Sequence, residues 1–267
     1  MSGFSAQWLA LREAHDRAAR SRTVLDGLAA AFAGAPAIAV VDLGCGTGST
    51  MRAIASLLPA RQHWRLIDDD EALLAYAARA APSGTDVTTV AADLAQHLER
   101  AIGEEPDVVT LSALLDLVSA AWLDRLVAVM VRLARPLYAA LTYDGEVGMT
   151  PATRHDATVI AAVNRHQLTD KGFGPALGPG AARTAPDCFR RNGFAVVEGR
   201  SDWRFGNGDR DIQLEMLAGW ASAAGEIGVA RSTLDEWLGE RRDHVAAGRS
   251  RMRVGHVDFF ARPTTRR

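Results

Sequence analysis

One short segment of the chain carries glycine at every second position and an acidic residue just before the first glycine. It reads Asp42-Leu-Gly44-Cys45-Gly46-Thr-Gly48 and follows an apolar run that is typical of a strand. Glycine has no Cβ, so its backbone can turn sharply and approach a ligand closely. With its acid, the loop suits a ligand that has a cationic head and an adenosyl group better than it suits a pyrophosphate.

Two more acidic positions follow strand-like runs further along the chain. Asp68 ends one run, 20 residues beyond Gly48, where it could accept hydrogen bonds from ribose hydroxyls. Asp93 ends the next run, where an adenine amino group could donate to it. Because Asp69 follows Asp68 directly, the ribose partner stays open between these two. Each acid alone would also fit a helix cap, but the loop and both acids together predict a nucleoside site.

The glycine spacing differs from that of a nicotinamide-binding loop. Such a loop normally reads G-x-G-x-x-G, with the third glycine packing helix against strand. Here the glycines are spaced G-x-G-x-G, and Ser49 stands where the third glycine would be. The spacing therefore favours another adenosyl ligand.

The elements that must position these residues alternate along the chain. Strand patterns occupy 37–42, 63–67, 86–91, 106–111 and 137–143, with helical patterns at about 47–58, 70–80 and 119–133. Strands that alternate with helices of this length predict a parallel sheet covered on both faces. Ligands of such sheets bind outside the carboxyl ends of the strands, where the topology switches.

Further elements flank this alternation. A helical pattern covers about 5–33, and after Tyr143 come a helical stretch at 151–167 and a glycine-rich loop. A short helix near 185–192, a strand at 194–203, helices near 209–224 and 231–247 and a last strand at 252–260 follow. We divide the chain into an N-terminal helical lid (1–36), a cofactor-binding core (37–143), an insert or cap (144–193), and closing strands with an inserted helical pair (194–267).

The strand ends and the loop together resemble the class I S-adenosylmethionine-dependent methyltransferases. The matching segments are Val41–Gly48, Ile67–Asp69, Ala91–Leu94 and Asp107–Ser112. The resemblance implies a doubly wound, seven-stranded, mostly parallel Rossmann-like sheet whose last strand is antiparallel. The N-terminal helix and the helical inserts would form a cap over it.

The family's binding roles fall on particular positions of this chain. Its glycine loop contacts the methionine part of the donor, which implies this role for Gly44, Gly46 and Gly48, with Cys45 in the same loop. The remaining implied contacts are the ribose with Asp68 or Asp69, the adenine with Asp93 and Leu94, the donor amino group with Asp42, and the methyl site with Ser112 and Ala113. Arg20, on the N-terminal helix, is our candidate for the donor carboxylate.

The chain departs from the amino-methylating branch of that family. The N/D-P-P-Y/F tetrad of those enzymes is absent, and Ser112-Ala-Leu-Leu stands after the fourth strand. This argues against DNA adenine and glutamine-type acceptors.

The resemblance implies a methyltransferase (EC 2.1.1.-) with S-adenosylmethionine as cofactor. A sulfonium is already an activated electrophile, so the enzyme mainly has to hold the acceptor in line with it. A base is needed only if the acceptor loses a proton. His166 and Asp116 are the first candidates, followed by Tyr143. Lys171 is a weaker candidate for binding the acceptor, against a solvated loop charge.

We expect the acceptor to be a small molecule methylated on oxygen or nitrogen. A protein or RNA acceptor, a nicotinamide-dependent oxidoreductase and a non-catalytic binding module remain as alternatives. A formal net charge of −2 without a long basic run disfavours nucleic acid as a partner. No apolar window is long enough to span a membrane, and Cys45 and Cys188 lack metal-type spacing, so we expect no metal. A cytoplasmic monomer or homodimer is the expectation.

Overall fold

The computed structural model describes residues 5–264, which fold around one sheet. The strands are β1 (Ile38–Leu43), β2 (Gln62–Asp68), β3 (Thr85–Ala91), β4 (Val108–Ser112), β5 (Leu137–Thr150), β6 (Phe194–Arg200), β7 (Trp203–Phe205) and β8 (Arg251–Pro263). The helices are α1 (Ala6–Ala19), α2 (Arg22–Phe32), α3 (Ser49–Ile54), α4 (Glu71–Arg79), α5 (Leu94–Ile102), α6 (Ala120–Leu133), α7 (Asp156–His166), α8 (Ala181–Arg191), α9 (Arg210–Glu226) and α10 (Arg231–Ala246), with short 3-10 helices η1 (Ala55–Leu57) and η2 (Gly178–Gly180).

The strand order is β3-β2-β1-β4-β5-β8-β6, and β7 also pairs with β8. Strands β1 to β5 pair in parallel, whereas β8 runs antiparallel to β5, β6 and β7. This confirms the doubly wound, mostly parallel sheet with an antiparallel last strand. The described residues form eight strands rather than the predicted seven, because the segment 194–203 breaks at Ser201 and Asp202 into β6 and β7.

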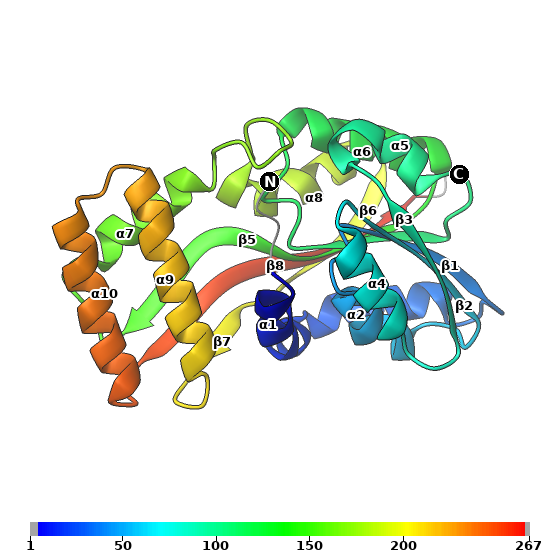
Figure 1. Ribbon diagram of the computed structural model, residues 1–267. Coiled ribbons are helices and arrows are strands. Elements are labelled where there is room, and N and C mark those ends of the chain that lie inside the picture. Colours follow the sequence, from blue (N-terminus) through cyan, green and yellow to red (C-terminus); the bar gives the residue numbers. More distant parts are fainter. Residues whose placement is uncertain (1–4, 265–267) are drawn as a thin grey trace.

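Helices cover both faces of the sheet (Figure 1). Helices α5, α6 and α8 pack on one face around a core that includes Leu98, Leu126 and Phe189. Helices α2, α3 and α4 pack on the other face around Leu28, Met51 and other apolar residues. Strands buried from both sides need apolar residues at successive positions, which explains the nearly continuous apolar runs of β1 and β4.

A second lobe lies beside this core. The outer parts of β5 and β8 extend past the other strands and carry β7, α7, α9 and α10 (Figure 1). This lobe has its own apolar core, which includes Val163, Phe205, Leu217 and Trp237. The predicted fifth strand therefore ended too early. The residues after Tyr143 alternate between exposed and half-exposed positions and give no apolar strand pattern. They nevertheless continue the strand, because they pair with β8 as far as Thr150.

The N-terminal segment also differs from its prediction. Instead of one helix over 5–33, the chain forms α1 and α2, with a bend at Arg20 and Ser21. Arg20 takes an extended backbone conformation with φ −51° and ψ 133°, and its side chain is buried against Tyr138. The Ser21 amide donates to a carboxylate oxygen of Asp258 on β8. Burial of these polar groups at the sheet fixes the bend.

Other boundaries shift by a few residues. The predicted helix at 47–58 is α3 followed by the 3-10 turn η1, and it stops before Pro59, which disfavours helical continuation. Helix α8 begins at Ala181 rather than near 185, because η2 leads directly into it. Helix α5 completes the alternation between β3 and β4.

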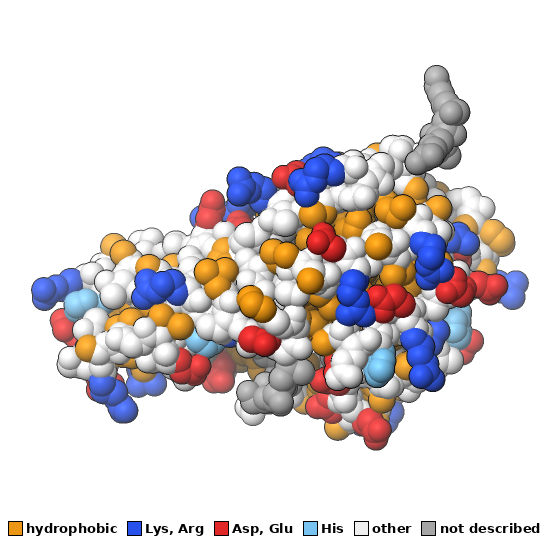
Figure 2. Space-filling view, turned by 90° about the horizontal axis from the view of Figure 1, so that it is seen from above, with side chains coloured by type: hydrophobic (Ala, Val, Ile, Leu, Met, Phe, Trp, Pro, Cys, Tyr) orange, Lys and Arg blue, Asp and Glu red, His pale blue; other side chains and the backbone are white. Residues whose placement is uncertain are grey.

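Two surface observations bear on partners. Within residues 5–264, no helix is both long and apolar enough to cross a bilayer. On the face drawn in Figure 2, Lys and Arg side chains are interspersed with Asp and Glu, and neither sign covers a continuous area.

Candidate active site

The loop after β1 needs glycine for its backbone shape. Gly44, Gly46 and Gly48 have φ values of 62°, 52° and 80°, in the left-handed region that other residues rarely adopt. A Cβ on Gly48 would also come within 3.1 Å of the Ala77 Cβ on α4. The loop therefore turns sharply at the carboxyl end of β1 and leads into α3.

Asp68 holds this loop against the end of β2. Its Oδ2 accepts a hydrogen bond from the Gly46 amide at 2.8 Å, and its Oδ1 accepts one from the Asp70 amide at 3.1 Å. Burial nevertheless raises the pKa of this carboxyl above its usual value, because desolvation outweighs the two backbone donors. Both carboxylate oxygens of Asp68 thus already accept hydrogen bonds from backbone amides. Its neighbour Asp69 is more exposed.

A cavity of about 810 Å³, here called the strand-edge cavity, opens at the carboxyl ends of the parallel strands. Its lining includes eight of the predicted donor-binding residues, namely Gly44, Gly46, Asp68, Asp69, Asp93, Leu94, Ser112 and Ala113. The parallel register explains this gathering. Leu43 pairs with both Ile67 of β2 and Leu111 of β4, so the segments after these strands begin side by side.

The acid after β3 serves as a helix cap as well as a wall of the cavity. Asp93 Oδ1 accepts from the Ala95 amide at 2.8 Å, which caps α5. Asp70 caps α4 in the same way, with Oδ1 accepting from Ala72 and Leu73. Carboxylates at helix N-termini are stabilised by the free amides of the first turn. The capping alternative and the ligand-binding prediction for Asp93 are therefore compatible.

Four of the predicted donor-binding residues are not part of the lining, namely Asp42, Cys45, Gly48 and Arg20. Asp42 is buried under the loop, where Thr110 Oγ1 donates to its Oδ1 at 2.7 Å and its Oδ2 has no partner. Burial raises the pKa of Asp42 to about 7. Arg20 lies behind the cavity wall and donates to Tyr138 and Thr50, with Ser112 Oγ at 3.5 Å.

The rest of the cavity lining comes from parts of the chain that are distant in sequence. Leu9 and Arg12 of α1 line it, and a Cβ placed on Gly46 would lie 3.2 Å from the Leu9 Cδ1. The segment 170–173 and two apolar residues after β4, Leu114 and Leu117, complete this side. Leu9 of α1 therefore lies against the glycine loop.

The three predicted catalytic residues do not line the cavity. Asp116 is buried between Leu114 and Leu117 in sequence, its Oδ1 has no hydrogen-bond partner, and burial raises its pKa to about 6. Tyr143 is buried too and donates to Asn164 Oδ1 at 2.7 Å, and burial raises its pKa. His166 lies at the end of α7 and contacts Glu226 of α9.

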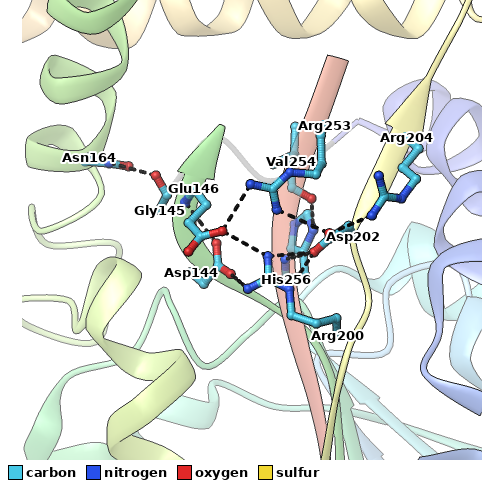
Figure 3. Close-up of polar contacts among 10 residues, drawn as sticks. All are labelled: Asp144, Gly145, Glu146, Asn164, Arg200, Asp202, Arg204, Arg253, Val254 and His256. Atoms are coloured by element: carbon cyan, nitrogen blue, oxygen red, sulfur yellow. Dashed lines mark hydrogen bonds and ion pairs between the residues drawn. The ribbon is translucent and has the colours of Figure 1, made fainter. Parts of the chain in front are cut away.

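His256 is a buried histidine that the sequence analysis did not single out. It pairs with Tyr143 across β5 and β8, and its ring lies 4.8 Å from that of Trp203. Burial lowers its pKa to about 4, and its Nδ1 lies 3.1 Å from the Val254 carbonyl, to which it donates. Figure 3 shows it beside the ion pairs of Asp202. Its position inside an ordinary strand pattern gave no chemical signal.

No group of three or more His, Cys, Asp or Glu side chains within residues 5–264 is arranged to hold a metal ion.

The central part of the chain matches a known sequence family. Residues 40–137 fit the family described as methyltransferase domain. This stretch begins in β1, ends at the first residue of β5, and includes the glycine loop and the strand-end acids. Residues 40–137 form a methyltransferase domain. The match supports the predicted enzyme type, a methyltransferase.

Solved structures share the fold of the methyltransferase domain and its additions at low sequence identity. A cyclopropane-fatty-acyl-phospholipid synthase-like protein from Lactobacillus casei is 17% identical, with 97% of this chain and 94% of that chain covered and a TM-score of 0.55. A candidate type II methyltransferase from Anaeromyxobacter dehalogenans is 20% identical, with 91% and 96% covered and a TM-score of 0.54. Among curated proteins, none matches the chain.

Proposed function

We propose that the strand-edge cavity binds S-adenosylmethionine and that the enzyme transfers the methyl group to an oxygen or nitrogen atom of a small molecule. The observation that supports this most is that one cavity is lined by the glycine loop and by the acids that follow β2 and β3. These groups match the methionine, ribose and adenine parts of the donor, in that order along the edge.

The donor is oriented by these contacts. Its methionine end lies against the open backbone of Gly44 and Gly46, its ribose faces Asp68 and Asp69, and its adenine lies by Leu94. The methyl group then points toward Ser112 and Ala113. Ala113 has a φ of 50°, which is unusual for a residue with a Cβ. Such backbone strain occurs at functional sites, where the surrounding structure holds it in place.

The reaction needs alignment more than acid–base chemistry. A lone pair of the acceptor attacks the methyl carbon, the carbon–sulfur bond breaks, and its electron pair stays on sulfur as S-adenosylhomocysteine forms. The positive charge of the sulfonium is lost as the acceptor takes the methyl group. Excluding water helps because charge is neutralised during this step. The apolar residues of the lining include Leu9, Leu114, Leu117 and Phe173.

Asp116 does not line the cavity itself, so it is our candidate for taking the acceptor's proton through a bridging water. It lies in the segment that follows the methyl site, and one of its carboxylate oxygens has no partner. A pKa raised to about 6 makes the carboxylate a better proton acceptor at neutral pH than an exposed one. Tyr143 suits this role less well, because its hydroxyl group already donates a hydrogen bond to Asn164 and because burial raises its pKa.

The size of the cavity supports a small-molecule acceptor. Pockets for small ligands commonly span roughly 300–1,000 Å³, and the strand-edge cavity, at about 810 Å³, falls in the upper part of that range. A donor and a small acceptor together match such a volume. A protein or RNA acceptor would instead call for an open, flat surface next to the methyl site.

Calorimetric titration with S-adenosylhomocysteine tests the proposal, with NAD as the comparison ligand. We expect saturable binding of S-adenosylhomocysteine alone. Absence of binding at millimolar concentration would contradict the donor site.

A matched pair of glycine variants locates the binding. Gly46→Ala and Gly84→Ala both place a Cβ at positive φ, 52° and 86°, but only Gly46 lines the cavity. We expect Gly46→Ala to weaken S-adenosylhomocysteine binding at least fivefold, about 1 kcal/mol, and Gly84→Ala to leave it unchanged. Equal effects would show that backbone strain, rather than contact with the ligand, is responsible.

A further inference from the structure

The part of the strand-edge cavity formed by α1 and the segment 170–173 contributes two cations. Lys171 and Arg12 line it, together with Leu114, Leu117 and Phe173. Five of the acidic lining residues follow β2 and β3, at the end that the proposed donor site assigns to ribose and adenine. The sixth, Asp170, precedes Lys171 in the chain, and its Oδ1 accepts from the Gly172 and Gly174 amides. The cavity is therefore acidic where the nucleoside binds, and its two cations come from other segments.

Lys171 is held in a fixed direction by neighbours that carry no carboxylate. Its Nζ donates to Thr169 Oγ1 at 2.9 Å and to His166 Nδ1 at 3.3 Å. An ammonium group has three N–H donors and no acceptor, so His166 Nδ1 must accept. The other ring nitrogen, Nε2, then carries the hydrogen and donates to Glu226 Oε2 at 2.9 Å. One N–H of Lys171 remains for a ligand.

The charge of Lys171 is not neutralised within the described part of the chain. No carboxylate of residues 5–264 lies within ion-pair distance of its Nζ, although Glu226 acts on it from beyond His166. Partial burial lowers its pKa, because desolvation disfavours the ammonium form. An anion bound at this position would reverse that effect and fill the free donor.

Arg12 differs from Lys171 because its charge is already shared. Its Nε donates to Asp16 Oδ2 at 2.9 Å, and its guanidinium lies over the Trp203 ring. Its terminal nitrogens make no hydrogen bond to residues 5–264 and are available to the cavity. It is placed next to Leu9, which covers the glycine loop, so it suits the carboxylate of the donor's methionine end. Lys171 is then the cation left for the acceptor.

We propose that the methyl acceptor carries an oxyanion, a carboxylate or a phosphate, and that Lys171 binds it, with His166 and Glu226 as positioning residues. This inference rests on the proposed function, because it takes the acidic end of the cavity as the donor site. In this proposal His166 is not the catalytic base that the sequence analysis expected. It instead positions Lys171 through the hydrogen bond to its Nζ.

The single lysine of the chain permits a direct test. Protein labelled with ¹⁵N-lysine gives one side-chain signal, from Lys171, which is followed while benzoate, phenyl phosphate or benzamide is added to the enzyme saturated with S-adenosylhomocysteine. We expect at least one of the two oxyanions to shift the signal saturably. Benzamide has the shape of benzoate without its charge and should not do so.

Variants separate charge from shape. Lys171→Met should weaken oxyanion binding at least tenfold, Lys171→Arg should retain most of it, and S-adenosylhomocysteine should bind to both with unchanged affinity. Arg154→Met removes an exposed cation outside the cavity and should have no effect.

Some outcomes would overturn the inference. These are equal binding of benzamide and the oxyanions, no shift with either oxyanion, or unchanged oxyanion binding in Lys171→Met. If S-adenosylhomocysteine itself does not bind to the wild-type enzyme, the proposed function fails, and the inference fails with it. If S-adenosylhomocysteine binds but the oxyanions do not, the proposed function stands and only the oxyanion site is ruled out.

Discussion

The two ends of the strand-edge cavity are built in different ways. The acidic end comes from residues 44–94, where consecutive β–α units bring their loops to one edge of the sheet. The other end combines α1, the segment after β4 and the segment 170–173, and Lys171 is held by α7 and α9 of the second lobe. The first end is specified by local sequence and the second by packing between distant segments. Mutations should therefore separate donor binding from the integrity of the second lobe.

The largest effect is expected inside the second lobe. Arg241 is fully buried and pairs with Asp156, and it also donates to the Pro151 carbonyl at 2.9 Å. Removing Arg241 leaves the partly buried Asp156 without its ion-pair partner and leaves the space of a fully buried side chain empty, and breaking such a pair typically costs about 3 kcal/mol. We expect Arg241→Ala to lower the free energy of unfolding by that amount in chemical denaturation, while the exposed neighbour variant Arg242→Ala changes it little. If a folded Arg241→Ala protein no longer bound S-adenosylhomocysteine, donor binding would depend on the second lobe, and the two ends would not be independent.

A pH-dependent effect is expected at Asp116, which is buried in the segment after β4. Its pKa of about 6 in the folded protein lies above the unfolded value of about 3.9. The carboxyl therefore favours folding fully below about pH 3.9, and this contribution is lost as the pH rises through about 6. We expect Asp116→Asn to be more stable than the wild type by about 1–3 kcal/mol at pH 8, with the difference vanishing near pH 4. If the free energies of unfolding of Asp116→Asn and of the wild type differed by the same amount at every pH from 4 to 8, the raised pKa would be refuted.

Asp68→Ala addresses the acidic end alone. It removes the acceptor of the Gly46 and Asp70 amides and one candidate ribose contact. We expect S-adenosylhomocysteine affinity to fall at least tenfold, about 1.4 kcal/mol, in calorimetry. Asp86→Ala, an exposed acid at the start of β3, serves as the control. Unchanged affinity in Asp68→Ala would assign the ribose to Asp69 or to another group.

The smallest effect concerns the ion pairs along β5, β6 and β8 (Figure 3). Asp202 is buried beside Arg200 and Arg253, and although burial opposes it, hydrogen bonds from these two arginines lower its pKa. Glu146 binds the same arginines from an exposed position. Asp202→Asn should lower the thermal unfolding midpoint by a few degrees, whereas Glu146→Gln should leave it unchanged, because exposed ion pairs contribute little. Equal shifts would show that the cluster acts as one unit.

The acidic end could be predicted in detail because its signals are local. Glycine at 44, 46 and 48 indicates a backbone shape, and an acid after each apolar run indicates a strand end. Parallel pairing then brings the strand ends together without further information. The sequence could not show that Asp42 and Arg20 are buried, because their burial depends on contacts with Thr110 and Tyr138, which are distant in the chain.

The opposite end was predicted only as a set of candidates. His166 and Lys171 were both singled out, but their contact depends on the turn after α7 and on Glu226, 60 residues further along the chain. His256 gave no signal, because a histidine inside a strand pattern is compatible with any environment.

The sequence by itself determined the doubly wound sheet, its methyltransferase domain and the row of glycines and acids along its edge. Periodicity and glycine conformation act over a few residues, and the register of the parallel strands then brings the strand ends together. The tertiary structure decided which of those groups face the cavity, that β5 and β8 extend into a second lobe, and that Lys171 and Arg12 also line the cavity. These outcomes depend on contacts between segments far apart in the chain, whose free energies no local pattern encodes.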